Sequence, residues 1–179
     1  MGIGRTFQIP RPIKRLSILE NVVVAAYFGQ NGKESQAASF DSAKDALEMV
    51  GLPTDSGASI STLGAAGLKK LELARALATK PELLLADESL GGLDNSEMDQ
   101  AADMLKRIRS EMGITIIWVE HIMGVLMRVV DRVMVLDHGE KISEGLPTQV
   151  ANDPKVIEVY LGTDASDAQA SADTQKETL

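Results

Sequence analysis

The sequence predicts an α/β fold with a mainly parallel sheet flanked by helices, because apolar runs of strand length alternate with stretches of helical periodicity. The run Leu83–Ala86 is closed by Asp87 and Glu88, and its uniform apolar character is typical of a strand buried on both faces of a parallel sheet. A helix over 95–112 and a second apolar strand over 114–119 follow it. In open α/β sheets ligands collect at the carboxyl ends of the strands, so the two acids are expected at a binding edge.

The acid pair is suited to hydrolytic chemistry that depends on magnesium. Asp87 can hold a magnesium ion directly or through water, and Glu88 can orient or deprotonate an attacking water. The alternative interpretation is a buried strand that becomes charged where it reaches solvent. The two residues alone do not decide between these interpretations.

The other elements follow from helix caps, spacing and turn residues. Ser17 and Glu20 have the spacing of a capping box and predict the start of a helix. His138 and Gly139 stand between two short strands and predict a tight hairpin turn. Residues 1–8 show neither a cap nor a helical period. The predicted elements are helices at 17–28, 42–50, 68–79 and 123–130, a buried strand at 132–137, a strand that pairs back with it at 140–144, and helices at 147–151 and 154–161.

Composition narrows the class of protein. The 179 residues carry a net charge of -8, which argues against a nucleic-acid binder because such proteins normally show a basic face. With no cysteine, the chain has neither disulfides nor a thiolate metal site. No apolar run approaches the roughly 20 residues that a spanning helix needs, so any membrane association is expected to go through a partner.

Several candidate motifs occur one after another along the chain. Gln8 comes first, and the segment 63–67 then precedes a helix. The acid pair closes the run at 83–88, the segment 91–94 reads Gly-Gly-Leu-Asp, and His121 comes just after a strand. This ordered set resembles the ATP-binding subunit of ABC transporters, and the likeness is greatest to the branched-chain amino-acid uptake type. The resemblance implies a partial P-loop NTPase fold of the ABC ATPase type with a helical subdomain.

The resemblance covers residues from about 2 to 162 and implies roles for individual residues. Glu88, His121 and Gln8 take catalytic positions. In the family the glutamate prepares the attacking water, and the histidine bonds the γ-phosphate. Asp87 and Gln8 take the positions that contact magnesium, so ATP and Mg²⁺ are the expected substrate and cofactor.

The segment from Leu63 to Gly67 takes the place of the transporter signature, L-S-G-G-Q, which in the family serves the ATP of the facing subunit. Only Leu63 keeps its consensus residue. Small residues leave the backbone accessible at a helix N-terminus, where free amides bind a γ-phosphate. The lost Ser hydroxyl removes a hydrogen bond worth about 1.5–3 kcal/mol to a charged group, so a weakened, variant site is expected. The four replacing residues are Gly64, Ala65, Ala66 and Gly67.

Asp94 has two compatible interpretations. With Glu97 three residues later, it has the spacing of an N-cap for the helix at 95–112. The resemblance gives it the D-loop position, which crosses a dimer interface. The resemblance also divides the chain, and the predicted segments are a Q-loop segment at 1–15, a helical subdomain with the signature region at 16–80, the C-terminal part of a RecA-like core at 81–162, and a disordered acidic tail at 163–179.

The sequence contains no phosphate-binding loop of the form G-x-x-x-x-G-K-S/T. In the nearest stretch, 29–35, Tyr27 takes the place of the first glycine and Glu34 that of the hydroxyl. A carboxylate in an anion cradle repels phosphate, so a polar turn is expected there. In the family the loop precedes the Q-loop. The chain is therefore expected to be N-terminally truncated, to lack N-terminal strands, to leave a slot in its sheet unpaired, and to bind nucleotide weakly or not at all.

Three functional hypotheses follow. In the first, the chain comes from the ATP-hydrolysing subunit of an importer, inactive as a fragment. That subunit works in a homo- or heterodimer with a second ATP-binding subunit, on transmembrane permease subunits at the cytoplasmic face of the plasma membrane. In the second, the chain is a non-hydrolysing domain that docks on a permease or an intact ATPase partner. The altered signature favours this hypothesis, and the intact acid pair and His121 oppose it. In the third, it is an unrelated doubly wound binding domain.

Overall fold

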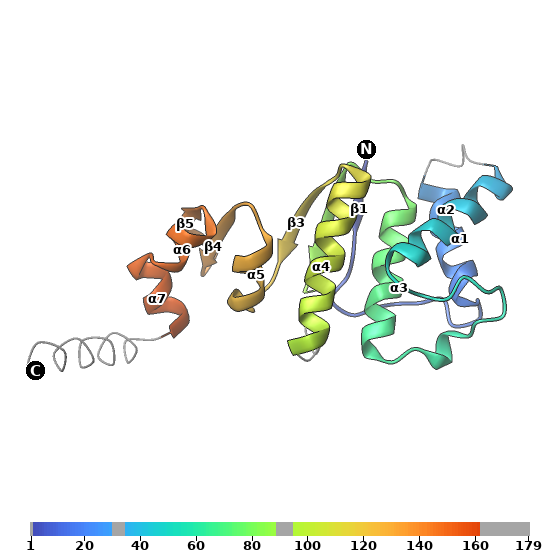
Figure 1. The fold of residues 1–179 in the computed structure, drawn as a ribbon, viewed down its shortest axis with the longest axis horizontal. Helices are drawn as coiled ribbons and strands as arrows, with labels where there is room; N and C mark the ends of the chain where they lie inside the picture. The colour runs from blue at the N-terminus through green and yellow to red at the C-terminus, as the bar shows by residue number, and fades with distance from the viewer. Residues whose placement is uncertain (1, 30–34, 89–94, 162–179) are drawn as a thin grey trace, which may run out of the picture. The chain divides into compact units, whose positions relative to one another are not determined.

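A computed structural model describes residues 2–29, 35–88 and 95–161, which fall into two compact units that divide after Ile122 (Figure 1). The first unit contains β1 (Ile3–Arg5), α1 (Ile18–Gly29), α2 (Gln36–Met49), a 3-10 turn η1 (Ile60–Thr62), α3 (Ala65–Ala78), β2 (Leu83–Asp87), α4 (Asn95–Met112) and β3 (Thr115–Val119). The second unit contains α5 (Met123–Val129), β4 (Val133–Asp137), β5 (Glu140–Gly145), α6 (Pro147–Ala151) and α7 (Pro154–Leu161).

The first unit is built on a parallel sheet with the strand order β1-β2-β3, which confirms the predicted fold class. Leu84 of β2 pairs with Gly4 on one side and with Ile116 on the other. β1 was not predicted, because three residues are too few to show a period. β1 forms because it pairs with β2. The ladder of hydrogen bonds continues beyond it, where the Thr6 amide donates to the Leu85 carbonyl at 3.0 Å.

The two faces of this sheet differ, and the prediction that β2 is buried on both faces is wrong within the described residues. Leu84 and Ala86 are buried, whereas the alternate residues of β2 are only half-buried. On the same face as these half-buried residues, Ile3, Ile117 and Val119 are 51%, 52% and 57% exposed. The first unit therefore has one covered sheet face and one open apolar face.

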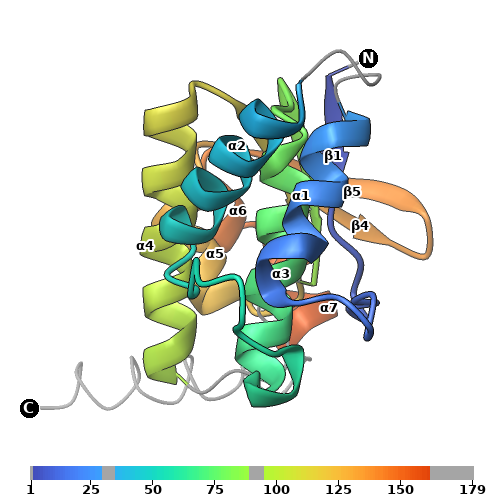
Figure 2. The same cartoon turned by 90° about the vertical axis from the view of Figure 1, so that its right-hand side faces the viewer.

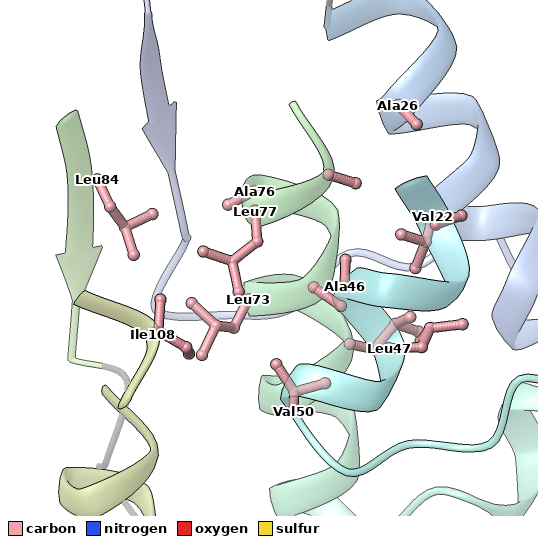
Figure 3. Packing of buried hydrophobic residues seen from close by; sticks show 14 of the residues in the cluster. Val22, Ala26, Ala46, Leu47, Val50, Leu73, Ala76, Leu77, Leu84 and Ile108 are labelled. Atoms are coloured by element: carbon pink, nitrogen blue, oxygen red, sulfur yellow. The ribbon is translucent and has the colours of Figure 1, made fainter. Parts of the chain in front are cut away.

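Helices supply the covering layer and the core. Figures 1 and 2 show α1 and α2 beside α3. In the close view, Leu73 and Leu77 of α3 approach Ile108 of α4 and Leu84 of β2, and all four belong to one buried cluster (Figure 3). The cluster joins the helical layer to the sheet, and Leu47 from α2 is fully buried in it. The helical layer thus fixes where the carboxyl end of β2 lies.

Most helix ends lie where caps predict them. The predicted capping box at the start of α1 is confirmed, since the Ser17 amide donates to Glu20 Oε2 at 2.7 Å and the Glu20 amide donates to Ser17 Oγ at 3.2 Å. Two helices begin earlier than predicted. α2 begins after Ser35, whose hydroxyl accepts from the Ala38 amide at 3.2 Å, and α3 begins at Ala65.

The second unit is small. β4 and β5 form an antiparallel hairpin that turns at His138 and Gly139, both with positive φ, as the sequence predicts. β4 differs from the buried strand that was expected, because Met134 and Leu136 are each 56% exposed and its inner side chains alternate with them. The buried residues of this unit that form its core are Val133, Val135, Val150 and Val156.

Some predictions concern residues outside those described. The polar turn at 30–34, Asp94 with the rest of 89–94, and the acidic tail at 163–179 belong to this group. The division into segments at 15, 80 and 162 stays a prediction. No helix in the described ranges is long and apolar enough to cross a membrane.

Candidate functional site

The carboxyl ends of β1 and β2 bring Gln8 and the acid pair together. The two strands are parallel and in register, so residues that follow them emerge at the same sheet edge. Gln8 Nε2 donates a hydrogen bond to Glu88 Oε2. Beside them, Arg5 Nη2 lies 3.2 Å from Asp87 Oδ2. This ion pair is exposed and contributes no more than about 1 kcal/mol, so it yields to a stronger partner of the carboxylate.

The backbone of Glu88 is held in an unusual conformation. Its φ is +43°, in the left-handed region that non-glycine residues seldom adopt. The Glu88 amide donates to the Val119 carbonyl of β3 at 3.0 Å, and the Glu88 carbonyl accepts from Lys69 Nζ of α3 at 3.0 Å. Such conformations persist where the surroundings hold them, and they gather at functional sites.

The backbone of Asp87 is fixed by Thr6. The Asp87 amide donates to Thr6 Oγ1 at 3.1 Å, and Thr6 is only 3% exposed. Thr6 and Lys69 were not singled out from the sequence. Their partners lie far away along the chain, and a buried threonine and a helical lysine are each too common to carry a signal alone.

His121 lies at the same sheet edge, two residues beyond Val119, which pairs with Asp87. Its side chain is 65% exposed, and its Nδ1 atom is 3.9 Å from Glu120 Oε2. Within the described residues, no hydrogen bond joins His121 to Gln8 or to Glu88. The structure thus brings together Gln8, Asp87 and Glu88 directly, and it places His121 near them by strand register alone.

The segment 63–67, predicted to be a variant signature, lies at the N-terminus of α3, which begins inside it at Ala65. Gly64 is the N-cap, with φ at −74° and no side-chain capping bond. The first amide to bond back within the helix is that of Leu68, which donates to the Gly64 carbonyl at 3.0 Å. A Cβ on Gly67 would lie 3.0 Å from Leu63 Cδ2, so the small residue there lets Leu63 pack over the first turn. The amides of a first helical turn have no acceptor within the helix, so this end of α3 has donors of the kind that bind anions.

The donors at the sheet edge fit one kind of magnesium site. Asp87, Glu88 and Gln8 offer hard oxygen atoms, and magnesium in proteins commonly takes one or two carboxylates and completes its shell with water and phosphate. Among the described residues, no group of three or more acids or histidines could hold a metal ion by itself. The donor set therefore fits magnesium that arrives with a phosphate ligand.

Comparisons with known proteins place the chain in a family. A family model described as "ABC transporter" matches residues 1–91. The high-affinity branched-chain amino acid transport ATP-binding protein LivG of Escherichia coli is 32% identical over 174 residues, which cover 90% of this chain and 68% of LivG. The chain belongs to the ATP-binding subunits of ABC transporters. A second family model, for branched-chain amino acid ATP-binding cassette transporters, matches residues 140–166 of this ABC transporter chain and agrees with the branch that the sequence resembles.

Solved structures agree with this assignment. The ATP-binding cassette MJ1267 in its ADP conformation aligns with a TM-score of 0.74 at 28% identity, covering 90% of this chain and 68% of MJ1267. The cassette MJ0796, solved as a dimer bound to ADP and phosphate, aligns with a TM-score of 0.70 at 29% identity, covering 81% of this chain and 62% of MJ0796. The chain spans about two thirds of the length of LivG and MJ1267.

Proposed function

We propose that this chain supplies the part of an ATP-hydrolysing site that handles magnesium and water, in an importer of branched-chain amino acids or a similar solute. The observation that carries the proposal is the hydrogen bond from Gln8 to Glu88 at the carboxyl edge of the sheet, with Asp87 adjacent. A carboxylate that is oriented by an amide and lies beside a second carboxylate is the arrangement that a metal-assisted hydrolysis needs.

Each residue has a distinct task in this proposal. Glu88 accepts a hydrogen bond from the attacking water and orients it, while Gln8 holds the Glu88 carboxylate in place. Asp87 would hold magnesium, which when bound neutralises charge on the phosphates. His121 donates to the γ-phosphate from the next strand along the sheet. The amides from Ala65 to Gly67 bind the γ-phosphate of the facing subunit's ATP, in a weaker form than a signature with Ser.

The phosphate-binding loop of the proposed site lies outside these 179 residues, and the sheet supports this inference. Among the described strands, β3 pairs with β2 only, so its other edge has unpaired amides and carbonyls. The face with Ile117 and Val119 is open, although parallel sheets are normally covered on both faces. A strand that pairs with β3 would satisfy this open edge, and a helix that follows the strand would cover the open face.

The right-handed rule for crossovers between parallel strands places the helix that follows this additional strand on the open face. The connections from β1 to β2 and from β2 to β3 run in the same direction across the sheet, and right-handed crossovers in one direction place their helices on one face. A crossover from a new strand beyond β3 back to β1 runs in the opposite direction. Its helix therefore lies on the other face, which is the open one.

The proposed partners are a second ATP-binding subunit and transmembrane permease subunits, which would hold the protein at the inner face of the plasma membrane. MJ0796 is a dimer in the structure with ADP and phosphate. The protein cbiO1 of Clostridium perfringens, described as part of the ABC transporter complex cbiONQ, aligns with a TM-score of 0.77 at 25% identity and covers 95% of this chain and 67% of cbiO1. These relatives support an assembly of the same kind for this chain.

The test is a Glu88→Gln substitution in the complete subunit, assembled with its permease. We expect the rate of phosphate release to fall at least about 100-fold with ATP binding retained, because general-base catalysis contributes that much or more. Glu82→Gln is the matched control, since this exposed acid lies at the other end of β2. Unchanged phosphate release in Glu88→Gln would overturn the proposal.

Two further measurements bear on the missing loop. The coding sequence upstream of Met1 is expected to contain an in-frame G-x-x-x-x-G-K-S/T motif. The 179-residue chain is expected to show no saturable binding of magnesium-ATP by calorimetry. Tight binding by this chain alone would contradict the inference that the loop lies elsewhere.

A non-hydrolysing docking domain is the second candidate, and the signature is the observation that favours it. Gly64 has no hydroxyl and makes no side-chain cap at the start of α3. Under this hypothesis the complete subunit assembles with its permease, and Glu88→Gln leaves the behaviour of the assembly unchanged.

A further inference from the structure

We propose that Lys69 is a positioning residue that ties α3 to the backbone of Glu88 and so sets the direction of the Glu88 carboxylate. This inference rests on the proposed function, because it gives Lys69 a part in the same site. It concerns how the carboxylate is aimed, which neither the family match nor the motifs address.

The first argument is the geometry of Glu88. Its backbone is left-handed, with φ at +43°, and its carboxylate accepts a hydrogen bond from Gln8 Nε2. Only the hydrogen bond from its amide to Val119 continues the ladder of the sheet. The Glu88 carbonyl is held from α3 instead, because it accepts a hydrogen bond from Lys69 Nζ at 3.0 Å.

The second argument is the strength of this bond. A hydrogen bond with an ionised donor is shorter and about twice as strong as one between neutral groups. The bond from Lys69 is partly buried, where solvent weakens it less than on an open surface. A strained backbone conformation raises the free energy of the folded state, and a charged hydrogen bond of this kind can offset that cost.

The third argument is the place of Lys69 on its helix. Lys69 lies one turn beyond Ala65, at the end of α3 that carries the variant signature. A helix is stiff over one turn, so a shift of its N-terminus moves the Lys69 ammonium with it. Lys69 therefore links the segment that serves the facing subunit's ATP to the carboxylate of the chain's own site.

Lys70 provides a matched control. It is the next residue on α3, it is half-buried like Lys69, and both lysines line the same cavity between α2, α3 and α4, with a volume of about 510 Å³. Within the described residues, Lys70 makes no hydrogen bond with Gln8, Asp87 or Glu88. A loss of helical charge or of side-chain packing affects both lysines, whereas a loss of the bond to Glu88 affects Lys69 alone.

The first experiment measures amide hydrogen exchange by NMR in the 179-residue chain. In Lys69→Met the Glu88 amide is expected to exchange at least about tenfold faster, because the conformation that presents it to Val119 loses a charged hydrogen bond. Lys69→Arg keeps a charged donor and is expected to restore slow exchange, and Lys70→Met is expected to match the parent. Unchanged exchange at Glu88 in Lys69→Met overturns the proposal. Equal acceleration at Leu84 and Ala86 also overturns it, because Lys69 would then stabilise the whole strand.

The second experiment measures ATP hydrolysis by the complete subunit in its transporter. Lys69→Met is expected to lower kcat about tenfold and to leave KM for ATP within about twofold, since a misdirected carboxylate impairs the chemical step and not nucleotide binding. Lys69→Arg is expected to recover most of the rate. A change in KM alone, or an equal loss in Lys70→Met, overturns the proposal. If Glu88→Gln has no effect on hydrolysis while the exchange result holds, the proposed function fails and the link between Lys69 and Glu88 stands.

Discussion

The two units of this chain use similar strands but bury them to different extents. β2 and β4 each consist of four apolar residues followed by an aspartate, and each is covered on one face only within the described residues. Around β2, side chains from α1 to α4 form a large buried cluster. Around β4, four valines make up the buried core. How much of a strand is buried thus depends on the elements that pack against it. An apolar sequence shows only that the strand can be buried.

A substitution in the large core tests this comparison with the largest effect. Leu47→Ala removes a side chain that is fully buried between α2 and the neighbouring helices. We expect the free energy of unfolding of the first unit to fall by about 2–5 kcal/mol, from lost transfer energy and an unfilled cavity. Denaturant titration, with amide exchange to assign the transition to residues 2–122, measures this. A loss below about 1 kcal/mol would show that the helical layer repacks freely.

The matching substitution in the small core is Val150→Ala on α6, where the valine is 1% exposed. Removing two methyl groups is expected to cost about 1.6 kcal/mol. The second unit has few other buried contacts, so we expect its amides to lose protection while those of the first unit keep theirs. Exchange that accelerates equally in both units would contradict the division after Ile122.

A third substitution adds a group at the signature. Gly64→Ser places a hydroxyl at the N-cap of α3, where φ is −74° and no atom lies within 4 Å of the added Cβ. Serine is a better N-cap than glycine by a few tenths of a kcal/mol, so stability is expected to rise by about that amount. Thermal unfolding measures the gain, and Gly57→Ser, in an equally open loop position, is the control. A lower midpoint for Gly64→Ser would contradict the cap geometry.

The smallest effect at neutral pH is expected for Asp153→Asn. Asp153 accepts from Ser143 Oγ at 2.6 Å and from the Lys155 amide at 3.0 Å, and these bonds lower the pKa of its carboxyl. A lowered pKa in the folded state means that the ionised group stabilises the second unit above its ordinary pKa, and that this contribution is lost as the pH falls through the lowered value. Asparagine caps a helix about as well as aspartate at neutral pH.

The measurement is the stability of the second unit from pH 7 to pH 2, followed by amide exchange or near-UV signals. Asp153→Asn is expected to flatten the acid branch of this curve. Glu158→Gln, on the outer surface of α7, is the control and is expected to leave the acid branch unchanged. An unaltered curve in Asp153→Asn would show that the Ser143 bond does not form in solution.

Local signals account for the parts of the fold that were predicted well. The bounds of α4, α6 and α7 match the prediction because proline, glycine and capping residues act within a few residues of a helix end. β1 and the first six residues of α2 were missed. β1 forms through pairing with β2, far away in the sequence, and Ser35 caps α2 from the end of a stretch that was interpreted as a polar turn.

The residues of the candidate site also divide into those with a local sequence signal and those that act through distant contacts. Asp87 and Glu88 stood out because they close an apolar run, and Gln8 depended on the family resemblance. The groups that aim these side chains could not be found from the sequence, because Thr6 and Lys69 act through hydrogen bonds across about 80 and 20 residues of chain. The functional roles of the site residues stay predictions.

The left-handed backbone of Glu88 sets the stability of the fold against the proposed catalytic role of this residue. Glycine adopts that conformation freely, and its substitution relieves about 1–2 kcal/mol of crowding against about 0.5–1 kcal/mol of added chain entropy in the unfolded state. Glu and Gly codons differ by a single base. Directed evolution of the complete subunit for heat tolerance alone would therefore enrich Glu88→Gly, and the surviving clones would be robust proteins without the carboxylate that the proposed hydrolysis uses to orient water.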